Sequence, residues 1–127
     1  MDYKVIENRY VGEDMYYIKI AGDFDAKMGQ FFMLRAWDNY PLLSRPISIY
    51  NIEEDGISFL YKVVGEGTKI LSKLDKDDDI NLQGPYGNGY EKVKGRVALV
   101  GGGVGIAPLY MVAQKIENCD CYLGFRE

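Results

Sequence analysis

The N-terminal part of the chain alternates short runs of β-branched and aromatic residues with turn-forming residues. Residues 3–11 and 15–21 are two such runs, and the intervening Gly12-Glu13-Asp14 is a turn signal, so a β-hairpin is expected. Further runs that predict strands cover residues 31–37, 43–52, 57–64 and 80–83. Together the runs predict an all-β, six-stranded antiparallel barrel.

A short helix is expected between the last two of these strands. Gly65-Glu66-Gly67-Thr68 breaks the fifth run, and Ile70, Leu71 and Leu74 follow at helical spacing. We therefore expect a helix that begins after Thr68 and packs inward. The acidic run over residues 75–79 predicts a solvated loop.

The hydrophobic pattern changes class near residue 95. Residues 97–100 form a continuous apolar run of the kind buried in parallel sheets, residues 107–116 have helical periodicity, and residues 121–125 predict another strand. This order predicts the first βαβ unit of an incomplete α/β domain. We place a β-barrel domain over residues 1–94 and the start of the second domain over residues 95–127. Because one such unit cannot cover both faces of its sheet, we expect a fragment, or a chain completed by a partner.

Composition excludes several classes of function. The 127 residues carry a net charge of −4, which disfavours a nucleic-acid partner because phosphate binding needs clustered Lys and Arg. No run of about eighteen apolar residues and no signal-peptide core is present, so we expect a cytoplasmic protein without a membrane partner. The chain has no histidine, the commonest general base and metal ligand. Chemistry, if any, must come from a cofactor.

The two cysteines do not suggest a metal site. Cys119 and Cys121 stand on the last predicted strand, and two thiols alone cannot complete a zinc or iron–sulfur site. We expect buried, reduced strand cysteines.

Two short motifs together suggest a cradle for a nucleotide. In Arg45-Pro46-Ile47-Ser48 the arginine offers a planar fork of donors to a phosphate, and the proline marks a place where strand pairing opens. Gly67-Thr68 could supply backbone N–H groups and a hydroxyl to a pyrophosphate at a helix start. Each motif also has a structural reading, as an ordinary strand segment and an ordinary helix cap.

Two glycine-rich segments add to this picture. Gly84 to Tyr90 is either a turn-rich connection or a place where the backbone approaches a ligand closely. Gly101 to Pro108 follows an apolar strand and precedes a helix, as phosphate-binding loops do. Its spacing departs from G-x-G-x-x-G, because Pro108 stands where the third glycine is expected, and no acidic residue for a ribose follows at about twenty positions.

These motifs, in this order, resemble the ferredoxin-reductase-like flavoproteins over essentially the whole chain. Within them the chain is most similar to the electron-transfer subunits of NAD-dependent dihydroorotate dehydrogenases. Arg45 to Ser48, combined with Gly65 to Thr68 and Gly84 to Tyr90, carries most of this resemblance.

The resemblance implies that FAD lies in a cleft of the barrel. The residues implied to contact FAD are Arg45, Pro46, Ile47, Ser48, Leu60, Tyr61, Lys62, Gly67 and Thr68. The residues implied to face NAD are Gly102, Gly103, Gly105 and Pro108. Arg45 would balance phosphate charge, and Ser48 would donate toward the flavin ring. Many relatives carry an aromatic residue where this chain has Ile47, so stacking on the flavin must come from elsewhere.

The resemblance also implies a role in pyrimidine biosynthesis. In this family an FMN-containing catalytic subunit oxidises dihydroorotate, and electrons pass through a 2Fe-2S cluster to FAD and then to NAD⁺ within a heterotetramer. No catalytic acid or base and no metal ligand is required of this chain. The cluster's four cysteines belong to a segment missing here, and Cys119 and Cys121 do not match them. The 127 residues are therefore expected to bind FAD and to be inactive alone.

Two alternatives stay open. The first is the similar small FAD subunit of NADH-dependent ferredoxin:NADP⁺ oxidoreductase or sulfide dehydrogenase, which shares the barrel and the glycine loop. The second is a non-redox module that uses the barrel for protein contacts. The Arg45 to Ser48 and Gly84 to Gly89 stretches favour the dihydroorotate dehydrogenase branch over the first alternative.

Overall fold

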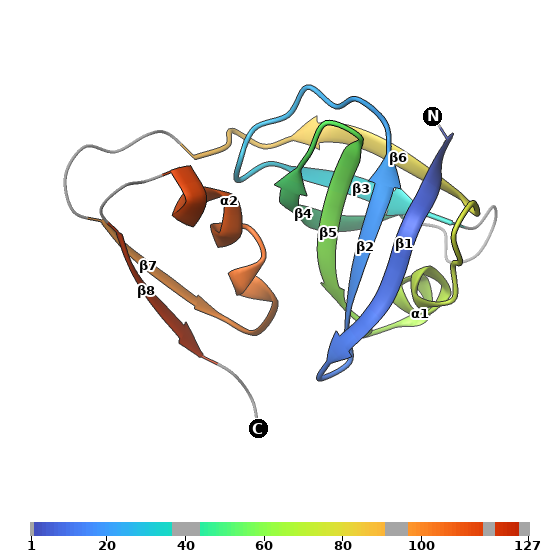
Figure 1. Cartoon of the computed structure of the whole chain (residues 1–127). Coiled ribbons are helices and arrows are strands. Elements are labelled where there is room, and N and C mark those ends of the chain that lie inside the picture. Colours follow the sequence, from blue (N-terminus) through green and yellow to red (C-terminus); the bar gives the residue numbers. More distant parts are fainter. Residues whose placement is uncertain (1, 37–43, 91–96, 116–118, 125–127) are drawn as a thin grey trace.

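The N-terminal part of the chain is a closed antiparallel barrel. The computed structural model describes residues 2–36, 44–90, 97–115 and 119–124. Six strands pair in the closed order β1-β2-β5-β4-β3-β6 (Figure 1). They are β1 (Asp2–Gly12), β2 (Met15–Ala21), β3 (Phe31–Arg35), β4 (Arg45–Ile52), β5 (Gly56–Lys62) and β6 (Asp79–Tyr86). The predicted six-stranded barrel is therefore confirmed.

The barrel encloses an apolar core supplied by alternate residues of its strands. Inward positions on β2 and β5 are fully buried, because alternate side chains of each strand point into the closed barrel. The buried core residues of the barrel include Val5, Ile18, Ile20, Phe32, Leu34, Ile49, Ile57, Phe59, Tyr61, Ile80 and Leu82. The short helix α1 (Glu66–Ser72) adds Leu71, which is also fully buried.

Two boundaries predicted in the barrel need correction. Helix α1 begins at Glu66 rather than after Thr68, because Thr68 is the residue whose side chain caps the turn. The last barrel strand reaches Tyr86 instead of ending at Gln83, since a register shift between Phe31 and Met33 keeps β3 paired with it through the glycine and proline. The ends predicted at residues 37 and 43 lie outside the described residues.

The rest of the chain forms a small α/β unit, called here the C-terminal unit. Strands β7 (Val97–Gly102) and β8 (Cys119–Gly124) pair in parallel, as predicted. Between them come η1 (Gly103–Ile106), a 3-10 turn, and α2 (Leu109–Lys115). The helix therefore starts two residues later than expected, just after Pro108. The boundary predicted between residues 94 and 95 lies outside the described residues.

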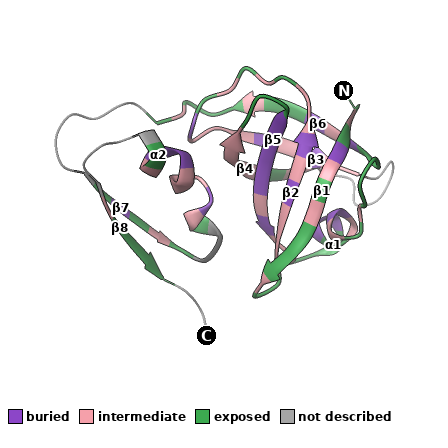
Figure 2. Cartoon of the chain, viewed as in Figure 1, coloured by how far each residue is buried: buried purple, intermediate pink, exposed green. Residues whose placement is uncertain are grey.

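Helix α2 lies between the two-stranded sheet and the barrel (Figure 1). Its buried residues Met111 and Val112 join Leu99 of β7 in an apolar contact on one face of the sheet. On the other face the paired residues Val100 and Tyr122 are exposed, and β8 is coloured mostly as exposed (Figure 2). Cys121 pairs with Leu99 in the sheet, yet it is an exposed free thiol on β8, so the expected burial of this cysteine is wrong. No helix in the described part of the chain has the length and apolarity to span a membrane.

Candidate functional site

The candidate site arises where strand β4 separates from strand β5. Their pairing begins at Ile49, which faces Phe59, whereas residues 45–48 are paired with β3. The corresponding end of β5 is paired with β2 instead. Pro46 lies in this separated stretch, where its missing N–H costs no hydrogen bond to β5. The prediction that the proline marks an opening in the pairing is confirmed.

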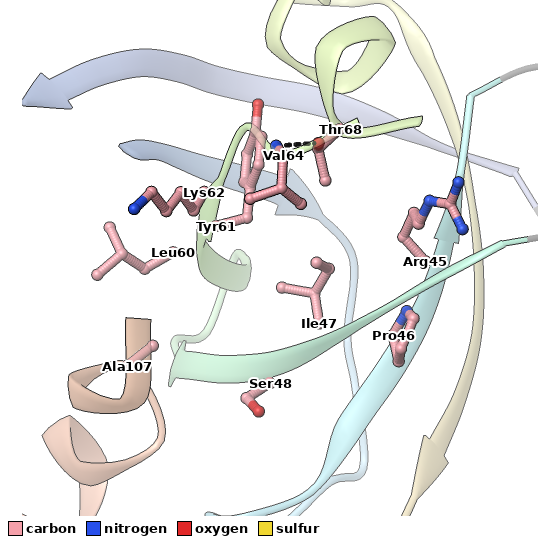
Figure 3. Close-up of a pocket in the computed structure, with 10 residues that line it drawn as sticks. All are labelled: Arg45, Pro46, Ile47, Ser48, Leu60, Tyr61, Lys62, Val64, Thr68 and Ala107. Carbon is pink, nitrogen blue, oxygen red and sulfur yellow. Dashed lines mark hydrogen bonds between the residues drawn. The ribbon is translucent and has the colours of Figure 1, made fainter. Parts of the chain in front are cut away.

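The separation of the two strands leaves a cleft of about 340 Å³ (Figure 3). Its lining residues are Arg45, Pro46, Ile47, Ser48, Leu60, Tyr61, Lys62, Val64, Thr68 and Ala107. The structure thus brings together eight of the nine residues predicted to contact FAD. Gly67 does not line the cleft, although it is buried beside Thr68.

Sequence reasoning missed two of the lining residues. Val64 follows directly after β5, and its side chain is 78% exposed at the rim. Ala107 comes from the C-terminal unit, which reaches across to the barrel at this point. Ala107 lies within the Gly101 to Pro108 segment, and that place in the sequence is the one signal that points to it.

The two faces of β4 present different chemistry to the cleft. Ile47 pairs with Phe32, whose ring is buried in the barrel, and Ile47 packs partly against the same core. Pro46 and Ser48 lie on the opposite side of the strand, as Figure 3 shows. Ile47 therefore gives the cleft an apolar surface, while Ser48 offers a hydroxyl that has no hydrogen-bond partner within the described part of the chain.

The cleft is locally positive in an acidic protein. Arg45 and Lys62 both line it, and no carboxylate does among the described residues. Neither side chain makes an ion pair or a hydrogen bond with another described residue. Two unpaired cations on one concave surface suit an anionic ligand such as a phosphate.

Thr68 has a structural role at the start of α1. Its hydroxyl accepts hydrogen bonds from the backbone N–H groups of Val64 (2.9 Å) and Gly65 (3.2 Å) and donates to the Gly65 carbonyl (3.2 Å). The hydroxyl proton is therefore used inside the turn, and the contact between Thr68 and a pyrophosphate stays a prediction. The first bond of the helical ladder runs from Lys69 N–H to Gly65, so the N–H groups of residues 66–68 precede that ladder.

A partly buried hydrogen-bond network ties this helix to the barrel wall. The Tyr61 hydroxyl donates to Asn8 Oδ1 (3.0 Å), and Asn8 Nδ2 donates to the carbonyls of Leu71 (2.8 Å) and Leu74 (2.9 Å) at the end of α1. Burial raises the pKa of the Tyr61 phenol, so it stays protonated and keeps donating at neutral pH. Tyr61 thus joins the cleft wall to the helix that carries Thr68.

The residues predicted to face NAD are not among the described residues that line the cleft. These residues are Gly102, Gly103, Gly105 and Pro108, whereas Ala107, in the same segment, does line it. A Cβ at Gly101 would lie 2.8 Å from Leu109 Cδ1 and 3.3 Å from the backbone of Ile106, so close packing requires this glycine. A Cβ at Gly105 would meet nothing within 4 Å.

The contacts of the Gly84 to Tyr90 segment support its interpretation as a turn-rich connection. Gly84 has φ of +148°, and a Cβ there would lie 2.9 Å from the Phe32 ring. The Gln30 side chain donates to the Gly87 carbonyl (2.8 Å), and Tyr90 N–H donates to Met28 (2.8 Å). These contacts tie the segment to the chain before β3, so its glycines serve turns and close packing.

Comparison with solved structures defines the class of protein. No family model matches the chain. A structure reported for an NADH-dependent reduced ferredoxin-NADP oxidoreductase superposes with a TM-score of 0.89 at 31% identity, covering 98% of this chain and 48% of that one. The barrel and the following α/β unit therefore have the ferredoxin-reductase-like FAD-binding fold.

Comparison with curated proteins narrows the class to particular relatives. The chain is 50% identical over 127 residues to the dihydroorotate dehydrogenase B (NAD(+)) electron transfer subunit of Clostridium acetobutylicum, covering 97% of this chain and 52% of that protein. The protein of the same name from Caldanaerobacter subterraneus subsp. tengcongensis is 39% identical over 132 residues, with 99% and 52% covered. The chain is a homologue of these electron transfer subunits and spans about half the length of each.

Proposed function

We propose that this chain binds FAD in the cleft between β4 and β5 and works as the FAD-carrying part of an electron-transfer subunit. In this role it passes electrons from dihydroorotate oxidation in a partner subunit to NAD⁺ in pyrimidine biosynthesis. The observation that carries the proposal is the cleft itself, where Arg45 and Lys62 stand unpaired beside the opening made at Pro46.

The lining residues suit the parts of FAD. The guanidinium of Arg45 and the ammonium of Lys62 match the charge of a pyrophosphate. Ile47, Leu60 and Val64 provide apolar surface for a planar ring, and the unpaired Ser48 hydroxyl is free to donate to a ring acceptor. The volume of about 340 Å³ lies at the lower end of the range for ligand pockets, so the cleft holds one part of the dinucleotide rather than all of it.

The flavin supplies the electron-carrying chemistry, and the chain's residues bind and orient it. Arg45 neutralises phosphate charge, and Ser48 orients the ring. Gly67 and Thr68 contribute backbone N–H groups at the helix start. We further propose that Gly102, Gly103, Gly105 and Pro108 face NAD, and the open space around Gly105 supports a close approach there. No side chain is assigned acid or base catalysis.

The partner and the remaining cofactors belong to the same proposal. The relatives are named as electron transfer subunits, and a subunit of this kind implies a catalytic partner subunit. We propose that this partner contains FMN, that the assembly is a heterotetramer, and that a 2Fe-2S cluster relays electrons. Cys119 and Cys121 are not proposed as cluster ligands. The cytoplasmic location and the domain division at residue 94 remain predictions from the sequence.

A second candidate has its own support. The structure reported for NADH-dependent reduced ferredoxin-NADP oxidoreductase is 31% identical to this chain, which keeps the small FAD subunit of such an enzyme as the runner-up. The 50% identity to a dihydroorotate dehydrogenase B subunit favours the first candidate. Assembly of the chain with a dihydroorotate-oxidising partner, rather than with a ferredoxin-dependent one, would decide between them.

Flavin binding is tested on the purified chain. The protein is incubated with FAD, separated from free FAD by gel filtration, and examined for the visible absorption of an oxidised flavin. Mass spectrometry of the heat-released ligand then distinguishes FAD from FMN, which is offered in a parallel incubation. We expect the protein to retain FAD. A protein that stays colourless in excess FAD would overturn the proposal and favour a non-redox interaction module.

A further inference from the structure

The junction between the barrel and the C-terminal unit is open along much of its length. Besides the cleft, cavities of about 380 Å³ and about 250 Å³ lie along this junction. Tyr50 and Leu60 border both of these cavities, and Leu60 also lines the cleft. Since little packing fills the space between the two parts, the few direct contacts across it must determine how they sit together.

One aromatic pair crosses this junction. The rings of Tyr50 on β4 and Tyr110 on α2 stack with centroids 4.4 Å apart and an angle of 14° between their planes. Tyr17 of β2 meets the Tyr50 ring edge-on at 6.0 Å, and the Arg9 guanidinium lies 4.9 Å from the centre of the Tyr17 ring. The pair is therefore braced from the barrel side by two further strands.

The backbone of β4 directs Tyr50 to this position. Ile49 faces Phe59 and Asn51 faces Ser58, so Tyr50 is the extra residue of a bulge opposite β5. Bulges re-aim a side chain and often border functional sites. On the other side, the Gln114 side chain donates to the Tyr110 hydroxyl (3.0 Å), which fixes the tilt of that ring on α2.

The stack lies next to the cleft on both sides of the junction. Tyr50 is two residues after Ser48 on the same outer face of β4, and Tyr110 is one helical turn after Ala107. Ser48 and Ala107 both line the cleft. A change in the stack would therefore move Ala107 and the glycine-rich turn relative to the residues proposed to orient the flavin.

We propose that the Tyr50–Tyr110 stack is the positioning contact that sets the orientation of the C-terminal unit relative to the cleft. Its purpose rests on the proposed function, because a fixed orientation would hold the NAD-facing turn at a constant distance from the flavin. The contact itself needs neither cofactor. A stacked aromatic pair of this kind shifts a docked-to-undocked ratio by about 2- to 10-fold.

The test measures distances between two spin labels in the whole chain. One label sits on the exposed Cys121 in a Cys119→Ser background, and the other on Lys73→Cys, which is exposed at the end of α1. Pulsed electron paramagnetic resonance then gives the distance distribution between the C-terminal unit and the barrel. We expect one narrow distribution with Tyr110 intact.

Variants of the pair separate positioning from a general loss of structure. Tyr110→Ala should lower the docked-to-undocked ratio by about 2- to 10-fold, whereas Tyr110→Phe, which keeps the ring, should preserve the narrow distribution. Tyr86→Ala, a matched removal of a partly exposed tyrosine from the barrel, should leave it unchanged. If Tyr110→Ala unfolds the C-terminal unit, Tyr50→Ala removes the same stack from the barrel side.

Two results would overturn the inference. One is a distribution in Tyr110→Ala or Tyr50→Ala that matches the parent protein, and the other is equal broadening in Tyr86→Ala. The measurement is made without flavin, so it stands apart from the proposed function. If the protein does not bind FAD but the distance between the labels still depends on the stack, the FAD proposal is refuted and the positioning contact is supported.

Discussion

The barrel and the C-terminal unit differ in how completely each encloses its own apolar residues. The barrel has no free strand edge at its core, and its inward residues on β2 and β5 are fully buried. In the C-terminal unit only one face of the sheet is covered, and on the other Val100 is 74% and Tyr122 is 59% exposed (Figure 2). The barrel is therefore the part that can carry a rigid binding site.

This difference explains where the cleft lies. In this closed barrel the cleft lies where one strand leaves its neighbour, at the stretch of β4 that contains Pro46. The rigid strands on either side fix Arg45 and Lys62 across the opening. Among the described residues, the C-terminal unit contributes Ala107 to this otherwise barrel-made site.

The sharpest test of the comparison is a cavity in the barrel core. Phe59 is fully buried and meets Phe32 edge-on at 5.8 Å. Phe59→Ala should lower the free energy of unfolding by about 3–5 kcal/mol, because it loses buried area and leaves a cavity. Chemical denaturation followed by circular dichroism measures the change. Leu123→Ala, at a position that is 45% exposed on β8, is the control and should stay within about 0.5 kcal/mol. Equal losses in both variants would contradict the contrast between the two parts.

The next largest effect is expected at the cleft. Arg45→Ala should weaken FAD binding by about 1.5–3 kcal/mol, a rise in Kd of about 10- to 150-fold, because a phosphate loses a charge-assisted hydrogen bond. Fluorescence titration with FAD measures the affinity. Lys69→Ala removes an exposed cation from α1 that does not line the cleft, so it should bind FAD almost normally. Unchanged affinity in Arg45→Ala, or an equal loss in Lys69→Ala, would argue against Arg45 as the phosphate contact.

Local sequence pattern predicted the site better than it predicted the details of each side chain. The six-stranded antiparallel barrel and the break at Pro46 follow from residue types and spacing, and both are confirmed. The Thr68 hydroxyl donates inside its own turn because of the turn geometry. The sequence alone does not distinguish this use of the hydroxyl from a contact with a ligand. The projection of Tyr50 depends on a bulge opposite β5, and the approach of Ala107 depends on how two units pack. To predict such features one must know how the strands and the two units are aligned against each other. The periodicity of a single segment does not contain this information.

A smaller effect is expected from the hydrogen bond behind the cleft. Tyr61→Phe keeps the buried ring and removes the bond to Asn8, so it should cost about 1 kcal/mol of unfolding free energy at neutral pH. Because burial raises the pKa of Tyr61, the unfolded chain ionises this phenol first as the pH rises. The stability from neutral Tyr61 is thus fully present below about pH 10 and is lost above it, toward the raised value of the folded state.

The loss of this stability at alkaline pH can be measured by thermal unfolding. Melting temperatures recorded from neutral pH to above pH 10 should converge for the parent protein and Tyr61→Phe, since only the parent loses the Tyr61 contribution. Asn8→Ala, which removes the acceptor while keeping the phenol, should retain the alkaline loss. A constant gap between the parent and Tyr61→Phe at every pH would show that the phenol does not titrate differently on unfolding.

The smallest effects separate two glycines of the C-terminal unit. Gly105→Ala meets open space and should leave stability unchanged or raise it by about 0.4–1 kcal/mol, because alanine reduces the freedom of the unfolded chain. Gly101→Ala must displace the end of the Leu109 side chain and crowd the Ile106 backbone, so it should destabilise the unit. Hydrogen exchange of the α2 amides reports this unit separately from the barrel. Faster exchange in Gly101→Ala alone would mark Gly101 as the packing glycine and leave Gly105 available for a ligand, whereas matching exchange in both variants would remove that distinction.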